Sequence, residues 1–130
     1  MRLLQKVNIM SRQPEHNLQK QIVSYLRGQG ILTIDTDVMS GLMFLGNSQR
    51  MRYGFINHHK RMGYTVGQPD LVLLLNDGET LLVELKDGNK NKQSQEQEYF
   101  EVLAKIRSHN YVVWKKFEDA VDFVKGYRKL

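Results

Sequence analysis

The sequence predicts an α/β fold, a mixed central sheet flanked by helices. An apolar stripe at helical spacing lies near the start, two short apolar runs joined by a turn lie in the middle, and strand and helix patterns alternate at the end. With 130 residues, of which 41% are hydrophobic and 25% charged, the chain has the size and composition of one globular domain. We therefore expect a single domain over residues 1–130.

The first half predicts a helix, a strand and a long loop. Leu18, Ile22 and Leu26 recur at helical spacing, which predicts an amphipathic helix over residues 13–27. The apolar residues 31–35 predict a short strand. Residues 39–67 are rich in glycine, methionine and basic side chains, and we expect an atypical basic loop there with a short strand at 42–45.

Two strands at residues 70–75 and 80–86 form a hairpin around Asn-Asp-Gly. A three-residue loop with Gly78 in the left-handed region makes paired positions sum to 154, so Asp70 lies opposite Glu84. Lys86 shares their face because strand side chains alternate. The opposite face is wholly apolar: Leu71, Leu73, Leu75, Leu81, Val83 and Leu85. A two-residue loop would turn Asp70 away from Glu84, and the first register is preferred because it gathers the charges on one face.

A helix, a strand and a second helix complete the pattern. The helix covers residues 94–109, and its apolar face is expected to hold Tyr99, Val102, Leu103 and Ile106. Residues 111–114 predict a strand. A final helix is marked by Phe117, Val121 and Val124. The predicted order is helix, strand, loop, two strands, helix, strand and helix.

The charges at the end of the hairpin predict a metal site. Two carboxylates directly opposite each other, Asp70 and Glu84, repel unless a cation compensates, and Mg²⁺ is held by one or two carboxylates with water and phosphate. Lys86 beside them can stabilise charge on an attacked phosphate. The alternative is a Glu–Lys pair on a solvated strand end, which would contribute little.

The charge balance points to a polyanionic partner. The net charge is +5, and no acidic residue occurs between Asp37 and Asp70. That stretch holds six basic or imidazole side chains expected to contact nucleic-acid phosphates: Arg50, Arg52, His58, His59, Lys60 and Arg61. A solvated basic loop is the alternative.

Several classes of protein are excluded or disfavoured by composition. No apolar run is long enough to span a bilayer, so no membrane association is expected. Without cysteine, disulfide frameworks and thiolate zinc sites are excluded, and an intracellular location is the expectation. His58 and His59 lack the distant Asn or His that a His-metal nuclease requires, so they are expected to contact phosphate or simply to lie on the surface.

The motifs around these residues resemble a known nuclease superfamily. "QPD" at 68–70 and "ELK" at 84–86 resemble the PD-(D/E)xK signature. With "GQPDLVLLL", "LLVELKDGNKNKQSQEQEYFEVL" and "VVWKKFEDAVDFV", the chain is similar to the VRR-NUC branch over about residues 12–125, least so over 36–62. The resemblance implies a restriction-endonuclease-like αβββαβ core.

The resemblance also implies roles for individual residues. Asp70, Glu84 and the backbone carbonyl of Leu85 match metal ligands, and Lys86 matches the residue that positions the attacking water. Glu15 matches an acid on the first helix and is expected to join the metal ligands; the alternative is a first-turn glutamate turned to solvent. Gln97 matches a helix glutamine, with Gln93 and Gln95 as competitors.

The implied activity is hydrolysis of DNA phosphodiester bonds with Mg²⁺ or Mn²⁺ and no small-molecule cofactor. Free-standing members look like homodimers related to Holliday-junction resolvases, which cut branched or duplex DNA by its structure rather than its sequence. A small free-standing member suits a phage or mobile-element setting. The linker before the expected helix at residues 94–109 is longer and more basic than the family pattern, so Lys90 and Lys92 are expected to contact phosphate. The alternative is a catalytically silent DNA-binding module of a replication or packaging complex, which would not need all of Asp70, Glu84 and Lys86.

Overall fold

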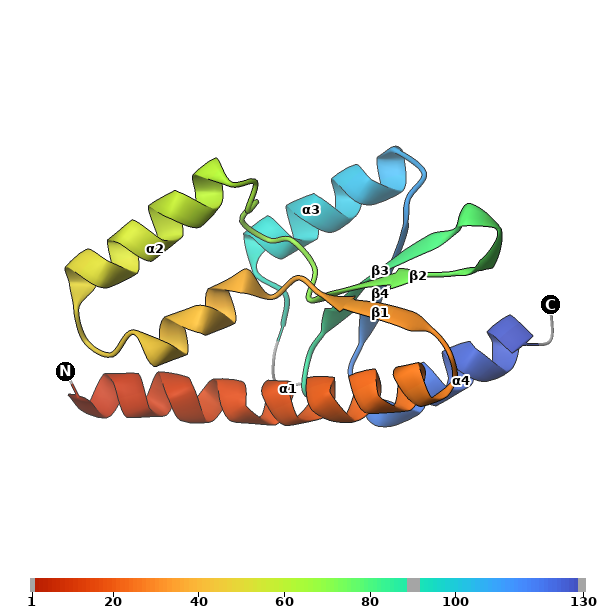
Figure 1. The fold of residues 1–130 in the computed structure, drawn as a ribbon, viewed down its shortest axis with the longest axis horizontal. Coiled ribbons are helices and arrows are strands. Elements are labelled where there is room, and N and C mark those ends of the chain that lie inside the picture. The colour runs from red at the N-terminus through yellow and green to blue at the C-terminus, as the bar shows by residue number, and fades with distance from the viewer. Residues whose placement is uncertain (1, 89–91, 129–130) are drawn as a thin grey trace.

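The computed structural model describes residues 2–88 and 92–128, and side chains from residue 15 onward. The helices and strands follow the predicted order, with one additional helix (Figure 1). The helices are α1 (Arg2–Gly28), α2 (Gln49–Arg61), α3 (Gln95–Ile106) and α4 (Phe117–Arg128). The strands are β1 (Leu32–Asp35), β2 (Leu71–Leu74), β3 (Thr80–Leu85) and β4 (Asn110–Trp114). Two 3₁₀ segments are η1 (Val38–Phe44) and η2 (Asn76–Gly78).

The four strands form one mixed sheet in the order β1-β2-β3-β4. Strand β2 pairs antiparallel with both β1 and β3, whereas β3 and β4 are parallel and are connected through α3. Helices α1 and α4 pack on one face of the sheet, and α3 packs on the other (Figure 1). This arrangement confirms the predicted α/β class with an αβββαβ core.

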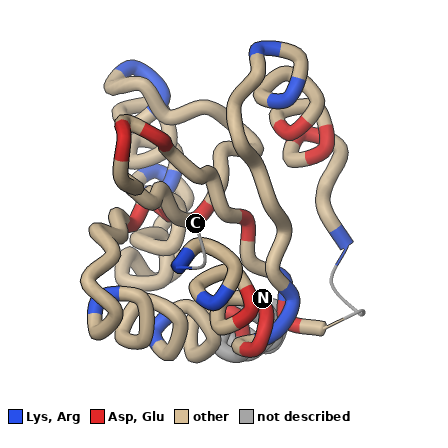
Figure 2. Tube along the Cα trace, turned by 90° about the vertical axis from the view of Figure 1, so that its right-hand side faces the viewer, with Lys and Arg blue, Asp and Glu red and all other residues tan. Residues whose placement is uncertain are grey.

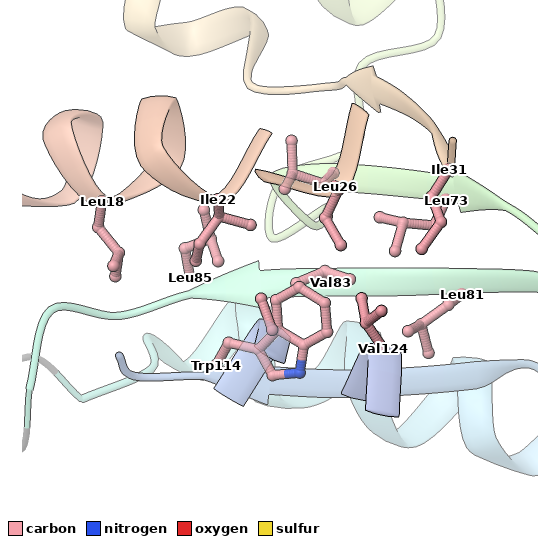
Figure 3. Packing of buried hydrophobic residues seen from close by; sticks show 12 residues of the cluster. Leu18, Ile22, Leu26, Ile31, Leu73, Leu81, Val83, Leu85, Trp114 and Val124 are labelled. Carbon is pink, nitrogen blue, oxygen red and sulfur yellow. The ribbon is translucent and has the colours of Figure 1, made fainter. Parts of the chain in front are cut away.

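The main core lies between the sheet and α1 with α4. Leu18, Ile22 and Leu26 point from α1 toward the sheet (Figure 3). They meet the predicted apolar strand face, of which five members are buried: Leu71, Leu73, Leu81, Val83 and Leu85. Burial of each such side chain stabilises the fold by roughly 1.5–3 kcal/mol. This core holds the strand ends rigidly in place.

The hairpin has the predicted register. Leu71 pairs with Val83, so the positions sum to 154. The turn has the predicted three residues, but Asp77 (φ 62°) adopts the left-handed region as well as Gly78 (φ 77°). Aspartate tolerates this conformation better than most residues. Beyond the last pair, the backbone N–H of Asp70 donates to the carbonyl of Val83 at 3.0 Å, which keeps Asp70 beside the third strand.

The predicted basic loop over residues 39–67 is wrong for most of its length. The segment contains η1 and the helix α2, and the expected strand at 42–45 does not form. Only Leu42 of η1 is buried, so the alternating burial of a strand is not realised. Helix α2 begins at an N-cap, where Ser48 accepts from the N–H of Met51 at 3.3 Å, and its last turn is basic, which suits the helix dipole.

Two other helices differ from their predictions. Helix α1 begins at Arg2 rather than near residue 13, because residues 2–12 contain neither glycine nor proline to end it. In α3 the apolar side chains Tyr99, Val102 and Ile106 are exposed, and the buried side is shifted by one residue to include Ala104. Within the described residues, no helix combines the length and apolarity needed to cross a membrane.

Segment η1 and helix α2 together form a helical arm, residues 38–61, which lies beside the N-terminal half of α1 (Figure 1). The two parts pack closely, since a Cβ at Gly41 would lie 2.9 Å from the ring of Phe55. Arg52 also ties them together, because its guanidinium donates to the carbonyls of Leu42 and Gly46 at 3.3 and 3.4 Å. The arm is therefore an ordered substructure.

Gly67 brings the loop before Asp70 against the start of α3. Its φ is +88°, and a Cβ there would lie 2.3 Å from the carbonyl oxygen of Glu96. No side chain fits at this distance, and the conformation itself disfavours every residue but glycine. The loop and α3 can therefore touch only through a glycine.

We expect Gly67→Ala to lower the free energy of unfolding by more than about 2 kcal/mol, since left-handed backbone strain adds to a backbone clash. Urea denaturation followed by circular dichroism measures this. Gly28→Ala is the matched control, because its Cβ would meet nothing within 4 Å. Equal midpoints for the two variants would contradict the close packing.

Candidate active site

Asp70 and Glu84 bring two carboxyl groups to the same end of neighbouring strands. Asp70 immediately precedes β2, and its Oδ2 accepts a hydrogen bond from the N–H of Leu85 at 2.8 Å. Glu84 lies within β3 and is only 1% exposed. The hairpin register thus places an aspartate and a buried glutamate next to each other, as predicted.

Two side chains, one polar and one cationic, contact the carboxylate of Glu84, and both approach the same oxygen. Its Oε1 accepts from the side-chain amide of Gln97 at 2.6 Å and lies 3.6 Å from Nζ of Lys86. Its Oε2 is buried and accepts no N–H hydrogen bond among the described residues, whereas a proton on Glu84 would allow a hydrogen bond between the two acids. A buried carboxylate oxygen without a donor is costly and usually marks a place where a ligand or proton belongs.

Gln97 is held in position by the start of α3. Ser94 caps the helix by accepting from the N–H of Gln97 at 3.2 Å, and the Gln97 carbonyl oxygen accepts from the N–H of Ser94 at 2.9 Å. This capping box leaves the amide NH₂ of Gln97 free to point at Glu84. Among the three glutamines considered, Gln97 alone has a hydrogen bond to Glu84, whereas Gln95 is exposed and Gln93 lies near Tyr111.

The surroundings favour the protonated form of both acids. Burial raises the pKa of Asp70, the N–H of Leu85 opposes this, and the charges of Asp37 and Glu15 raise it further. Burial also raises the pKa of Glu84, the charge of Asp70 adds to the rise, and Lys86 opposes it. The pair therefore retains a proton at pH values where ordinary carboxyl groups are ionised.

These groups line a pocket of about 290 Å³ between α1, the loop before β2 and α3. Five predicted side chains meet there: Glu15 from α1, Asp70 just before β2, Glu84 and Lys86 from β3 and its end, and Gln97 from α3. Several further polar side chains of the lining were not predicted from the sequence: His16, Thr36, Asp37, Ser40, Tyr64 and Gln68. Of these, Asp37 had a usable signal, because it is a carboxylate just past a predicted strand end.

The donor set fits a hard divalent cation. Carboxylate oxygens and a backbone carbonyl are the ligands that Mg²⁺ and Mn²⁺ prefer. Throughout residues 2–88 and 92–128, no group of three or more His, Asp or Glu side chains is placed to hold a metal ion by itself. Asp70 and Glu84 suffice for Mg²⁺, which usually keeps several waters. Glu15 shares the pocket without forming a three-carboxylate cluster.

The predicted phosphate-contacting residues lie outside the pocket lining. Arg50, His58, Lys60 and Arg61 are exposed on α2. Arg52 is partly buried within the helical arm, and His59 packs against Phe55 with ring centroids 4.3 Å apart. Lys92 is exposed before α3, and Lys90 lies outside the described residues. Lysines and arginines are spread over several elements, with acidic positions between them (Figure 2).

The structure is similar to a solved structure titled "VRR_NUC domain". The TM-score is 0.59 at 22% identity, over 88% of this chain and 97% of that chain. Another solved structure, titled "VRR_NUC domain protein", is 28% identical over 58% of this chain and 63% of its own, with a TM-score of 0.48. No family model and no curated protein matches the sequence. The first match confirms the expected resemblance at the level of the fold, which is restriction-endonuclease-like.

We expect the metal-free protein to become less stable as the pH rises. Because the folded pKa values of Asp70 and Glu84 are raised, the folded state binds more protons than the unfolded chain, so stability falls from about pH 4 upward through neutrality. Urea unfolding in EDTA at pH 5 and pH 8 measures this loss. Glu84→Gln should lose less stability than wild type between these values, and parallel losses would contradict the pKa assignment.

Proposed function

We propose that this chain is a divalent-metal-dependent nuclease that hydrolyses DNA phosphodiester bonds, with residues 1–130 as one nuclease domain. The observation that carries the proposal is the buried carboxylate of Glu84, whose Oε2 accepts no N–H hydrogen bond among the described residues and which lies beside Asp70 and Lys86. Such an arrangement destabilises a fold unless it serves a ligand. A VRR-NUC-like fold supports the same reading.

The carboxylates of Asp70 and Glu84 would hold Mg²⁺ or Mn²⁺, together with the backbone carbonyl of Leu85. A bound divalent ion would neutralise charge on the phosphate and lower the pKa of the attacking water. The N–H of Leu85 already fixes one oxygen of Asp70, which leaves the other oxygen for a ligand. Glu15 would add negative charge to the same pocket, since it already acts on Asp70.

Lys86 would act on the attacking water and the phosphate, and Gln97 would orient the carboxylate of Glu84. Nζ of Lys86 lies 3.6 Å from Glu84, close enough to orient a water for attack on phosphorus and to stabilise the pentacovalent phosphate. Gln97 donates to Glu84 and so fixes which carboxylate oxygen faces the pocket. Gln97 is therefore a positioning residue rather than a catalytic one.

Basic side chains outside the pocket would bind the rest of the DNA. Arg50, Lys60 and Arg61 on α2 and Lys92 before α3 are exposed and would contact backbone phosphates, with His58 as a further contact. Lys90 remains a prediction outside the described residues. Arg52 and His59 have structural contacts within the helical arm, so their part in binding would be smaller.

A catalytically silent DNA-binding module is the second candidate. It would keep the basic side chains and the fold, but it would gain nothing from two carboxyl groups with raised pKa values in a shared pocket.

Selectivity for branched DNA and a homodimer with two active sites also remain predictions. Sedimentation velocity of the free protein tests the dimer.

We expect wild type to cleave DNA with Mg²⁺ or Mn²⁺ but not with EDTA, and Asp70→Ala to reduce the rate at least about 100-fold while still binding DNA. Labelled four-way junction, flap, duplex and single-stranded DNA are compared in one series. The silent module would instead bind each substrate and cleave none of them with either metal.

Two variants distinguish the positioning role of Gln97 from its role in the helix cap. We expect Gln97→Leu to reduce kcat about 10-fold or more, because Glu84 loses its donor. Ser94→Ala should lower stability by about 1 kcal/mol and leave kcat unchanged. Urea unfolding and initial cleavage rates at saturating metal measure both effects. If kcat falls in both variants in proportion to their loss of unfolding free energy, Gln97 acts only through the helix cap.

A further inference from the structure

Helix α2 presents an outward face unlike the rest of the molecule. Its inward side holds the partly buried Arg52, Phe55, Ile56 and His59. On the opposite side, residues at helical spacing share one exposed stripe: Arg50, Tyr53, Asn57, Lys60 and Arg61. Tyr53 is 66% exposed, although a tyrosine ring normally packs against the protein. The stripe combines cations, an amide and an aromatic ring.

The charge of this face selects a polyanion. Helix α2 carries no acidic residue, and none occurs from residue 38 through residue 69. The exposed apolar side of α3 is different, because Tyr99 is flanked there by Glu96 and Glu98. From Arg50 to Arg61 the stripe spans about 16 Å, enough for several phosphates along a nucleic-acid strand.

The helical arm leads directly to the catalytic pocket. Val38, Met39 and Ser40 at its beginning line the pocket, as do Tyr64 and Val66 just after its end. Both ends of the arm therefore lie at the pocket, and α2 extends away from the sheet (Figure 1). A strand bound along α2 would run toward Asp70 and Glu84.

We propose that α2 binds a single-stranded segment of the DNA substrate, with the ring of Tyr53 stacked on an unpaired base and Arg50, Lys60 and Arg61 on the flanking phosphates. Phosphate contacts alone would not distinguish paired from unpaired strands, but a base can stack on a side chain only where it is released from the duplex. This deepens the proposed function by naming the substrate class: DNA with unpaired nucleotides beside the cleaved bond.

Binding in EDTA tests this inference apart from cleavage. Fluorescence anisotropy compares labelled oligo(dT) with a blunt duplex of equal length, for wild type, Tyr53→Ala and Tyr53→Phe. We expect Tyr53→Ala to weaken oligo(dT) binding on the order of 10-fold, with duplex binding changed less than about 2-fold. Tyr53→Phe should keep wild-type affinity, because its ring can still stack.

Two controls separate stacking from charge and from general surface effects. Tyr99→Ala removes a tyrosine with a similar exposure, 67%, from the acidic side of α3 and should leave oligo(dT) affinity unchanged. Arg50→Gln should reduce the salt dependence of binding, with the slope of log K against log salt falling by about 0.7, whereas Tyr53→Ala should leave that slope unchanged.

The inference is overturned if Tyr53→Ala binds oligo(dT) as wild type does, if it weakens duplex binding equally, or if Tyr99→Ala has the same effect. It stands if the selective loss is seen, even where wild type cleaves nothing with either metal. That last result would reject the nuclease proposal alone, so the two failures are distinguishable.

Discussion

Burial of the Glu84 carboxyl group is the constraint on which the rest of the site depends. An ionised carboxylate that is 1% exposed is tolerated only with compensating partners. Lys86 supplies charge, Gln97 donates a hydrogen bond to one oxygen, and the second oxygen accepts no N–H hydrogen bond among the described residues. The sheet holds Glu84 there because β3 is paired on both sides. Asp70 is brought alongside by the hairpin register, and the pair consequently retains a proton at pH values where ordinary carboxyl groups are ionised.

The hairpin and its group of charged side chains, Asp70, Glu84 and Lys86, could be predicted because their rules are local. A side-chain period of two and a three-residue turn are enough to place Asp70 opposite Glu84. Gln97 could be predicted only through resemblance, although the Ser94-x-x-Gln97 spacing is itself a capping-box signal. The contact of Gly67 with the backbone of Glu96 could not be predicted, because it joins a loop to the first turn of α3, and their approach is set by tertiary packing.

Helix α2 was missed for a physical reason. None of its residues is buried, so it lacks the apolar stripe by which helices are recognised in a sequence. It is stabilised by the Ser48 cap, by a basic last turn and by contacts of Arg52 and Phe55 with η1. A helix with most of its surface exposed to solvent is stable only when capping and local side-chain contacts are sufficient or when a binding partner covers it. The basic and aromatic side chains of α2 suit DNA as that partner.

Titration calorimetry of Mn²⁺ into the wild-type protein and into Asp70→Asn, at pH 7 in two buffers of different ionisation enthalpy, tests the proposed metal site most directly. A cation that binds between Asp70 and Glu84 must displace the proton that their surroundings hold. Wild type should bind Mn²⁺ and release protons, and Asp70→Asn should bind much more weakly. Absence of binding, or binding that is equal in both proteins and releases no proton, would contradict a metal-dependent active site in this pocket.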